Sequence, residues 1–519
     1  MKIHLTFVSV LLLAFACQNS NTKHVVEEEV AETVVISHLP DTSYPSVAKY
    51  IKYRIDTLDT EKSGYIDDLS DQYADAPGYF TFRGAPDRSA PFKGRVTGRP
   101  SKVVVDWIFR TPYDTVKTYM GSWGGGTGWT GQPLYVNWPD SLVEKFRNSS
   151  SQLTEDFSNE EIMVASLARN VYFIDFQTGK ASREPLSTMN PVKGTISLDP
   201  SLNGRLYVGH ALPMSTIGAL VLDLFKHETL NFFGRDPEAW RSWGAYDSSP
   251  VAVGDFMIRP GENGTIYKIE RFADDFKIHS TLRYKDNGGA GGMESSMAVY
   301  RNYGYIGDNH GKILCVNLDN LKPVWVHDIH DDTDATPVVQ EEDGVPMVYA
   351  SCEVDKQGGY GYSNFTKLNG LNGEVVWCQS IPCRKRDWAG KVREGGMFST
   401  PYIGRGDCDS LIFTNFCFPE DHPNVSEFVA MNRYTGEIMY KNTMDFYAWS
   451  SPVGFLNEDN ELFIVTGDII GNIYLIQGRT GEVIFKEHIG DNFESSPVVI
   501  DSSFVVGSRG TQIFKMHLE

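Results

Sequence analysis

Two phrases near the carboxyl end, Trp449-Ser-Ser-Pro452-Val-Gly and Glu494-Ser-Ser-Pro497-Val-Val, decide the fold predicted for this chain. Each begins an apolar strand, which is followed by a second strand ending in Gly and by a third strand such as residues 471–476. Related blade-start motifs occur at residues 247–250, 294–297, 334–337 and 398–401, with weaker copies at 130–133 and 193–196. Successive copies lie 40 to 64 residues apart, which is room for four short strands each.

The end of each repeat has its own pattern. Thr-Gly or Asn-Gly turns at Gly179, Gly373, Gly436 and Gly481 precede the fourth strand, and Gly suits the positive φ of a tight turn. The fourth strand repeatedly carries an aromatic residue, as at Trp325, Trp377, Tyr440 and Phe485. Both features mark the repeat boundary.

Eight four-stranded repeats predict an all-β, eight-bladed β-propeller over residues 77–519, because a closed ring protects the edges of its sheets. Seven blades is the alternative, since the first two copies are weak. The last copy has only three strands before Glu519, whereas residues 103–109 form an apolar, aromatic strand ahead of the first copy. We therefore expect this amino-terminal strand to close the last blade.

The amino end has the pattern of an export signal. Residues 5–16 are largely apolar, too few to span a bilayer as a helix, and Ala16 precedes Cys17 as in a bacterial lipobox. We expect a signal peptide over residues 1–16 and lipidation of Cys17; a cleaved signal without lipid is the alternative. Residues 17–76 are polar and acidic on average, and predict a lipid-anchored acidic tether.

Composition limits the partners. The formal net charge is −20, so nucleic acid and anionic lipid surfaces are excluded as binding partners, and any membrane association would come through the lipid anchor alone. Hydrophobic residues at 41% exclude disorder for the bulk of the chain. Without a C-x-x-C spacing, the six Cys after Cys17 are expected to be buried or disulfide-bonded. His327 and His330 lie in an acidic segment that we expect to be solvated rather than to bind metal.

Several motifs carry a resemblance to a known family. The phrases Ser-Ser-Pro-Val and Gly-Asn-Ile-Tyr-Leu-Ile resemble the repeats of pyrroloquinoline quinone (PQQ)-type propellers. Residues 82–88, Phe-Arg-Gly-Ala-Pro-Asp-Arg, resemble the lead-in before the first blade of such proteins. This quinoprotein-like family includes alcohol dehydrogenases and also non-catalytic lipoproteins similar to BamB of the outer-membrane assembly machinery.

The resemblance implies where the catalytic parts of the enzymes should be sought. Those enzymes carry an adjacent Cys pair, a Trp platform and a calcium ion held by Glu, Asn and Asp beside a catalytic Asp. The sequence has no adjacent Cys pair, and we match no full set of calcium ligands and base to it. We therefore expect no catalytic residues, no metal and no cofactor.

The third residue before the Pro of each blade-start motif should recur at one height around the ring. In order, this position holds Thr130, Lys193, Asp247, Glu294, Asp334, Phe398, Trp449 and Glu494. An acidic arc beside an aromatic one would suit a segment containing Lys or Arg, or a stacked sugar. The alternative is a solvated rim with ion pairs to Lys193 and Arg393. Trp123 and Trp129, in a Gly-rich loop, offer a further stacking surface or bury against the first blade.

These patterns predict a monomeric, non-catalytic envelope lipoprotein at the outer membrane, a scaffold that binds an envelope protein or a polysaccharide through a propeller face. The alternative is a PQQ-dependent dehydrogenase, with PQQ and calcium, or a carbohydrate-binding propeller that uses the central channel.

Overall fold

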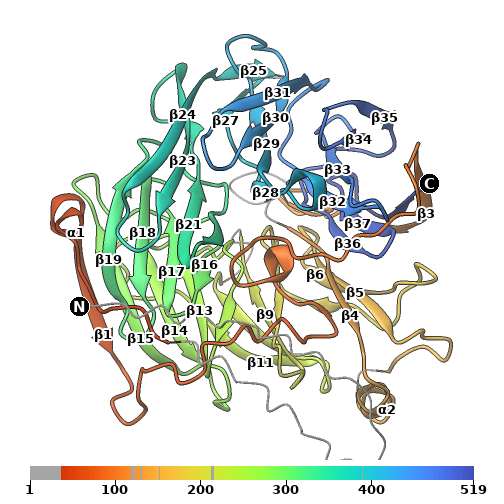
Figure 1. Ribbon diagram of the computed structural model, residues 1–519. Helices are drawn as coiled ribbons and strands as arrows, with labels where there is room; N and C mark the ends of the chain where they lie inside the picture. The colour runs from red at the N-terminus through yellow and green to blue at the C-terminus, as the bar shows by residue number, and fades with distance from the viewer. Residues whose placement is uncertain (1–36, 118–122, 129–130, 151, 212–215, 389) are drawn as a thin grey trace, which may run out of the picture. The chain divides into compact units, whose positions relative to one another are not determined.

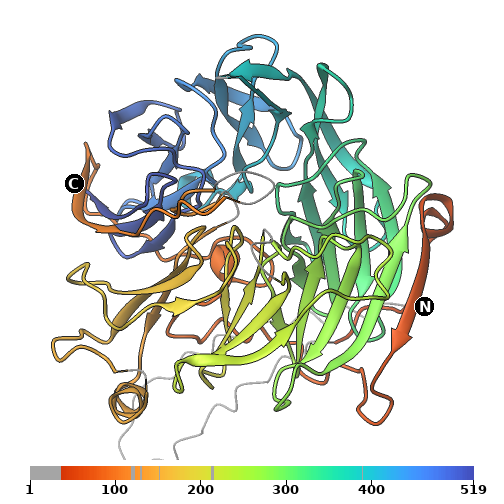
Figure 2. The same cartoon turned by 180° about the vertical axis from the view of Figure 1, so that it is seen from behind.

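The computed structural model describes residues 37–117, 123–128, 131–150, 152–211, 216–388 and 390–519. The predicted signal peptide, Cys17, Trp129 and Thr130 lie outside these residues. Eight antiparallel sheets form an eight-bladed β-propeller, as predicted, so the seven-bladed alternative is wrong (Figures 1 and 2). In Figure 1, β16, β28 and β36 lie nearest the middle of the ring, and β3, β19, β24 and β35 lie at its rim.

The first four blades use strands that lie between Lys52 and Asp328. Blade 1 contains β2 (Gly78–Tyr79), β4 (Leu134–Asn137), β5 (Glu160–Ala165), β6 (Asn170–Asp175) and β7 (Leu186–Ser187). Blade 2 contains β8 (Ser197–Leu198), β9 (Arg205–Gly209), β10 (Ala219–Asp223) and β11 (Glu228–Phe233). Blade 3 contains β12 (Val251–Val253), β13 (Phe256–Gly261), β14 (Thr265–Glu270), β15 (Ile278–Lys285) and β1 (Lys52–Thr57). Blade 4 contains β16 (Ala298–Tyr300), β17 (Tyr303–Gly307), β18 (Lys312–Asn317) and β19 (Lys322–Asp328).

The remaining blades complete the ring. Blade 5 contains β20 (Val338–Glu342), β21 (Val345–Ala350), β23 (Tyr360–Asn369) and β24 (Val375–Arg384). Blade 6 contains β28 (Tyr402–Ile403), β29 (Leu411–Cys417), β30 (Ser426–Asn432) and β31 (Ile438–Thr443), extended by β22 (Glu353–Val354) and β27 (Gly395–Gly396). Blade 7 contains β32 (Val453–Leu456), β33 (Leu462–Gly467), β34 (Asn472–Gln477) and β35 (Val483–His488). Blade 8 contains β36 (Val498–Ile500), β37 (Ser503–Gly507), β38 (Gln512–Leu518) and β3 (Val103–Arg110).

Short elements lie between and around the blades. A separate hairpin pairs β25 (Arg386–Trp388) with β26 (Lys391–Arg393). The helices are α1 (Pro45–Tyr50), α2 (Asp140–Arg147) and the short 3-10 turns η1 (Phe82–Gly84) and η2 (Gly406–Cys408).

Strand β3 closes the ring as predicted. It pairs antiparallel with β38, from Val103 opposite Leu518 to Arg110 opposite Gln512. The last blade therefore joins three carboxy-terminal strands to one amino-terminal strand, and β38 has a partner on both edges.

The Ser and Thr residues of the blade-start motifs explain why the motif repeats. In four pairs of neighbouring blades, the hydroxyl before the Pro-equivalent position accepts a hydrogen bond from the backbone N–H of the same position in the other blade. The bonds run from Gln132 to Thr195 (2.9 Å), from Ser249 to Ser296 (2.9 Å), from Ser296 to Thr336 (2.9 Å) and from Thr400 to Ser451 (3.0 Å). A small hydroxyl satisfies a buried N–H without filling the crowded axis of the ring.

The aromatic residue of the outer strand packs on the turn Gly of the next blade. Trp325 lies against Gly373, and Trp377 lies against Gly436; a Cβ on either Gly would come within 2.8 Å of the indole ring. Trp325 Nε1 also donates to the Gly370 carbonyl at 2.8 Å. The two repeat features predicted separately are thus one contact between neighbouring blades, and the positive φ of Gly373 (76°) adds a second reason for Gly.

The lead-in at residues 82–88 ties several blades together along the axis. Arg83 Nη1 donates to the carbonyl of Pro452 at 3.0 Å, and Arg88 Nε donates to that of Met297 at 2.8 Å. Both arginines are fully buried. The lead-in contacts blade-start motifs at and after their Pro-equivalent positions, since the Pro86 carbonyl also accepts from Val299 N–H.

Residues 37–76 differ from the expected tether. Strand β1 pairs with β15 over six positions and becomes the outer strand of blade 3, and Ser37–Glu519 forms one compact unit. Four apolar side chains anchor the segment and are at most 5% exposed: Val47, Ile51, Ile66 and Tyr73. Because the segment is polar on average, its sequence did not predict these four buried side chains. The predicted tether is therefore reduced to residues 17–36.

Candidate functional site

A first set of carboxylates gathers around one lysine. Asp247, Glu262 and Glu294 can bring one oxygen each within 4.8 Å of one another. Asp247 and Glu294 stand at the predicted position of the blade-start motifs before β12 and β16, and Glu262 lies in the turn between β13 and β14. Lys193, from the motif before β8, pairs with Asp247 and donates to Glu294 at 3.2 Å.

Burial favours the protonated forms of Asp247 and Glu262 in this first set. Asp247 is 1% exposed. Burial raises the pKa of Asp247 to about 6, although the Lys193 ammonium opposes that rise. The pKa of Glu262 lies well above its usual range because of burial and the charges of Glu294 and Asp247. Burial alone would lower the pKa of Lys193, but Asp247 and Glu294 raise it well above its usual value, so Lys193 is a permanent cation.

A second carboxylate set contains Asp332, Asp334 and Glu353, whose oxygens also lie within 4.8 Å of one another. Asp334 is the predicted residue before β20, Asp332 precedes it in the same loop, and Glu353 begins β22. Lys356, itself 45% exposed, approaches Asp332 at 3.7 Å. Glu353 is 5% exposed, and no hydrogen bond or ion pair reaches its carboxylate from the described part of the chain.

The second set holds protons more strongly than isolated carboxyl groups. Burial raises the pKa of Asp332 to about 7, with Lys356 opposing the rise. Burial and neighbouring carboxylates raise the pKa values of Asp334 and Glu353 well above their usual range. Because Glu294 and Asp247 contribute to the rise at Asp334, the two sets share one electrostatic environment, which we call the acidic cluster.

The predicted aromatic arc is built, but it is largely covered. The rings of Phe398 and Trp449 lie 5.2 Å apart, and Phe398 is buried in a cluster with Tyr447. Arg393, from the β25–β26 hairpin, places its guanidinium 6.0 Å from the Trp449 ring centroid and 5.3 Å from that of Trp388. The Arg393 guanidinium therefore already lies near the Trp449 and Trp388 rings, and Phe398 is buried. Little ring surface is left for a stacked sugar.

Two other predicted residues lie outside the acidic cluster. Glu494 accepts a hydrogen bond from Asn492 at 2.7 Å and lies 3.8 Å from Arg509. Arg509 also lies over the Trp123 ring, 5.9 Å from its centroid, and donates to the Trp123 carbonyl at 3.1 Å. Trp123 is thus half-buried against blade 8, which favours the structural interpretation of the Gly-rich loop.

Sequence reasoning identified Lys193, Asp247, Glu294 and Asp334, but it missed Glu262, Asp332 and Glu353. The missed residues lie outside the repeat position that we compared. The Asp332-Thr-Asp334 spacing was a usable signal, because alternate residues of an extended segment point to the same side. His327 and His330 instead line a separate pocket of about 270 Å³ with Cys378, and the described residues bring no metal-ligand group together there.

Of the two alternatives predicted for the cysteines, buried thiols or disulfides, the described part of the chain shows free thiols. Cys315, Cys352, Cys383, Cys408 and Cys417 are buried free thiols, and Cys378 is exposed.

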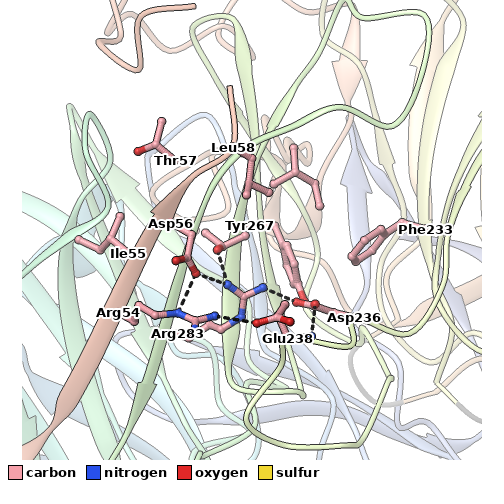
Figure 3. A pocket seen from close by; sticks show the side chains of 12 residues that line it. Arg54, Ile55, Asp56, Thr57, Leu58, Phe233, Asp236, Glu238, Tyr267 and Arg283 are labelled. Atoms are coloured by element: carbon pink, nitrogen blue, oxygen red, sulfur yellow. Dashed lines mark hydrogen bonds and ion pairs between the residues drawn. The ribbon is translucent and has the colours of Figure 1, made fainter. Parts of the chain in front are cut away.

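A groove of about 590 Å³ lies beside β1, and none of the residues that line it belongs to the acidic cluster. Figure 3 shows its side chains. Its charged side chains already pair with one another. Arg283 bridges Asp56 at 2.6 Å and Asp236 at 2.8 Å, and Arg54 contacts Asp56 at 2.9 Å. These ion pairs connect β1 to blade 3, and each carboxylate among the described lining residues has a partner.

Comparison with known proteins identifies the fold. No protein-family model and no curated protein matches the chain. Quinohemoprotein alcohol dehydrogenase from Comamonas testosteroni aligns with a TM-score of 0.58 and 12% identity, over 86% of this chain and 81% of that one. A europium-containing methanol dehydrogenase aligns with a TM-score of 0.56 and 11% identity, over 86% and 99%. BamB from Moraxella catarrhalis aligns with a TM-score of 0.49 and 14% identity, over 69% and 94%. The chain therefore has a PQQ-like propeller fold, as its repeats predicted.

This fold raises the question of whether the channel suits PQQ and a divalent cation. PQQ carries three carboxylates, which would meet six carboxylates and a lysine already paired with two of them. The acidic cluster therefore does not fit the quinone. Carboxylate oxygens are the donors that hard divalent cations prefer, so the cluster suits positively charged ligands.

No helix in the described residues is long and apolar enough to cross a membrane.

Proposed function

We propose that this protein is a non-catalytic binding propeller whose acidic cluster receives a positively charged group of an envelope protein. One observation carries the proposal: six carboxylates share a single site with one internal lysine, and one of them, Glu353, is buried without a partner. A buried carboxyl group without a counter-ion holds its proton more strongly, as the raised pKa of Glu353 indicates, and a cation from outside would stabilise its ionised form.

The rest of the chain supports a scaffold at the cell envelope. The apolar segment before Cys17 suits export and lipidation, and residues 17–36 then link the lipid anchor to the propeller. The net charge of −20 would steer basic partners toward the protein. A protein partner is favoured over a polysaccharide because Arg393 and the buried Phe398 leave little free aromatic face for a sugar.

Binding of a basic peptide tests this function. The full chain, purified in detergent, is titrated against a fluorescently labelled peptide rich in Lys and Arg and against an acidic peptide of equal length. We expect saturable binding of the basic peptide alone. The triple variant Asp247→Asn, Glu294→Gln and Asp334→Asn should weaken it at least tenfold. A matched control neutralises three exposed acids, Glu437→Gln, Asp459→Asn and Glu487→Gln. Equal loss in both triple variants, or no binding at all, would show the proposal to be wrong.

A PQQ-dependent dehydrogenase is the second candidate, because the carboxylate sets have donors suited to calcium. A thermal-shift titration with PQQ and CaCl₂ tests it. We expect no saturable rise in Tm from the quinone, since its carboxylates oppose those of the acidic cluster. A saturable rise would restore the dehydrogenase and call for assays of alcohol and sugar oxidation.

A further inference from the structure

The first carboxylate set shows how this propeller binds an ammonium group. Lys193 stands at the third position before the Pro-equivalent residue of its blade-start motif, and its Nζ bridges Asp247 and Glu294, which occupy the same position in the next two blades. A primary ammonium has three donors and a compact charge, so it can join carboxylates that converge from different blades.

The second carboxylate set repeats this arrangement without its own lysine. Asp334 occupies the repeat position that Lys193 occupies in blade 2, and it faces Asp332 and Glu353. Lys356, which is 45% exposed, contacts Asp332 at 3.7 Å and does not pair with Glu353 in the described residues. Glu353 is nevertheless 5% exposed and directed at the other two carboxylates.

We infer that the second carboxylate set is a subsite for the ammonium group of a lysine side chain of the partner, bound between Glu353, Asp334 and Asp332 as Lys193 is bound between Asp247 and Glu294. The inference rests on the proposed function and names the side chain that the acidic cluster selects. It is carried by the buried, unpartnered Glu353 together with the internal example of Lys193.

Lysine suits this subsite better than the other cations that a carboxylate set attracts. A guanidinium is a planar fork that favours two parallel bonds to one carboxylate, whereas three carboxylates from separate segments converge here. The neighbouring aromatic cluster already contains the guanidinium of Arg393. A calcium ion takes 6–8 oxygen ligands, so it would need second carboxylate oxygens, waters or backbone carbonyls in addition to one oxygen from each of these residues.

The test compares oligolysine and oligoarginine peptides of equal length, labelled alike, on the full chain in detergent at pH 8. We expect oligolysine to bind at least tenfold tighter than oligoarginine. Glu353→Gln should remove this preference, and Asp334→Asn, a second variant in case Glu353→Gln fails to fold, should do the same. The exposed Glu487→Gln serves as the matched control and should keep the preference.

Three results would overturn the inference. Equal affinity for the two peptides would show that the subsite does not select lysine. An unchanged preference in Glu353→Gln and Asp334→Asn would place the selection elsewhere. Displacement of oligolysine by CaCl₂ that depends on Glu353 would identify a metal site instead. In each of these cases the triple variant described above still reports on the proposed function, so failure of the subsite and failure of basic-peptide binding can be told apart.

Discussion

The two carboxylate sets differ in where their positive charge comes from. The first set contains Lys193, which bridges two of its three carboxylates, and it is therefore complete within the chain. The second set has the same number of carboxylates, and the cation that contacts it among the described residues is Lys356, at its edge and 3.7 Å from Asp332. The comparison shows how one repeat position serves two purposes: a lysine there ties blades together, and an aspartate there leaves a subsite open.

Removing Lys193 should have the largest effect. Lys193→Met leaves Asp247 and Glu294 without their counter-ion, so we expect a loss of about 3–5 kcal/mol in the free energy of unfolding. Urea denaturation at pH 8 measures the loss. At pH 5 the loss should shrink, because Asp247, whose pKa is about 6, is then mostly protonated. Lys180→Met, at an exposed lysine, is the control. An equal loss of stability in Lys193→Met and Lys180→Met would show that Lys193 is not the counter-ion that stabilises the first set.

Placing a lysine in the second set should make it resemble the first. Asp334→Lys removes one carboxylate and supplies an ammonium beside Glu353 at the repeat position of Lys193. We expect a gain on the order of 1.5–3 kcal/mol at pH 8, the range of a charge-assisted hydrogen bond. Oligolysine binding should be lost at the same time. A stabilised variant that still binds oligolysine would contradict the shared role of the position.

The wild-type protein should lose stability as the pH rises from 5 to 8. In the folded state the pKa values of Asp247 and Asp332 are raised to about 6 and 7, whereas the unfolded value is about 3.9. Proton binding by these two groups therefore stabilises the folded state fully below about pH 3.9, and this stabilisation is lost as the pH rises through the raised values. The charges facing Asp332 are Lys356, Glu294, Asp308, Asp355 and those of its own set. Thermal unfolding across this range measures the slope, and Asp332→Asn should flatten it. A Tm that is constant, or that rises with pH, would contradict the raised pKa values of Asp247 and Asp332.

The smallest effect is expected from neutralising Glu353 alone. Glu353→Gln removes repulsion between carboxylates, so Tm should rise by about 2 °C at pH 8, which corresponds to roughly 1 kcal/mol. The rise should be smaller at pH 5, because the raised pKa of Glu353 favours its protonated form as the pH falls. The exposed control Glu487→Gln should leave Tm unchanged at both values of pH. A fall in Tm at pH 8 would mean that Glu353 has a stabilising partner.

The sequence predicted the parts of the molecule that repeat. The Ser/Thr-Pro motif, the turn Gly and the outer aromatic residue recur because each blade makes the same contacts with its neighbours, as Trp325 does with Gly373. The same regularity placed Asp247, Glu294 and Asp334 at one level. Glu262 lies in the turn between the second and third strands of its blade, a repeat position that we did not compare, whereas Glu353 comes from the inserted strand β22. The approach of Glu353 to Asp334 depends on tertiary packing that the repeat pattern does not record.

The pairing of β3 with β38 makes the completion of synthesis a condition for folding. Val103 has to meet Leu518, a separation of 415 residues, before the last blade exists. Such a distant contact is slow to form, and an unfinished chain would keep β3 as an unpaired edge open to proteases and to aggregation. For a chain that leaves the ribosome amino end first, β3 is therefore among the first blade strands to be made and among the last to be paired.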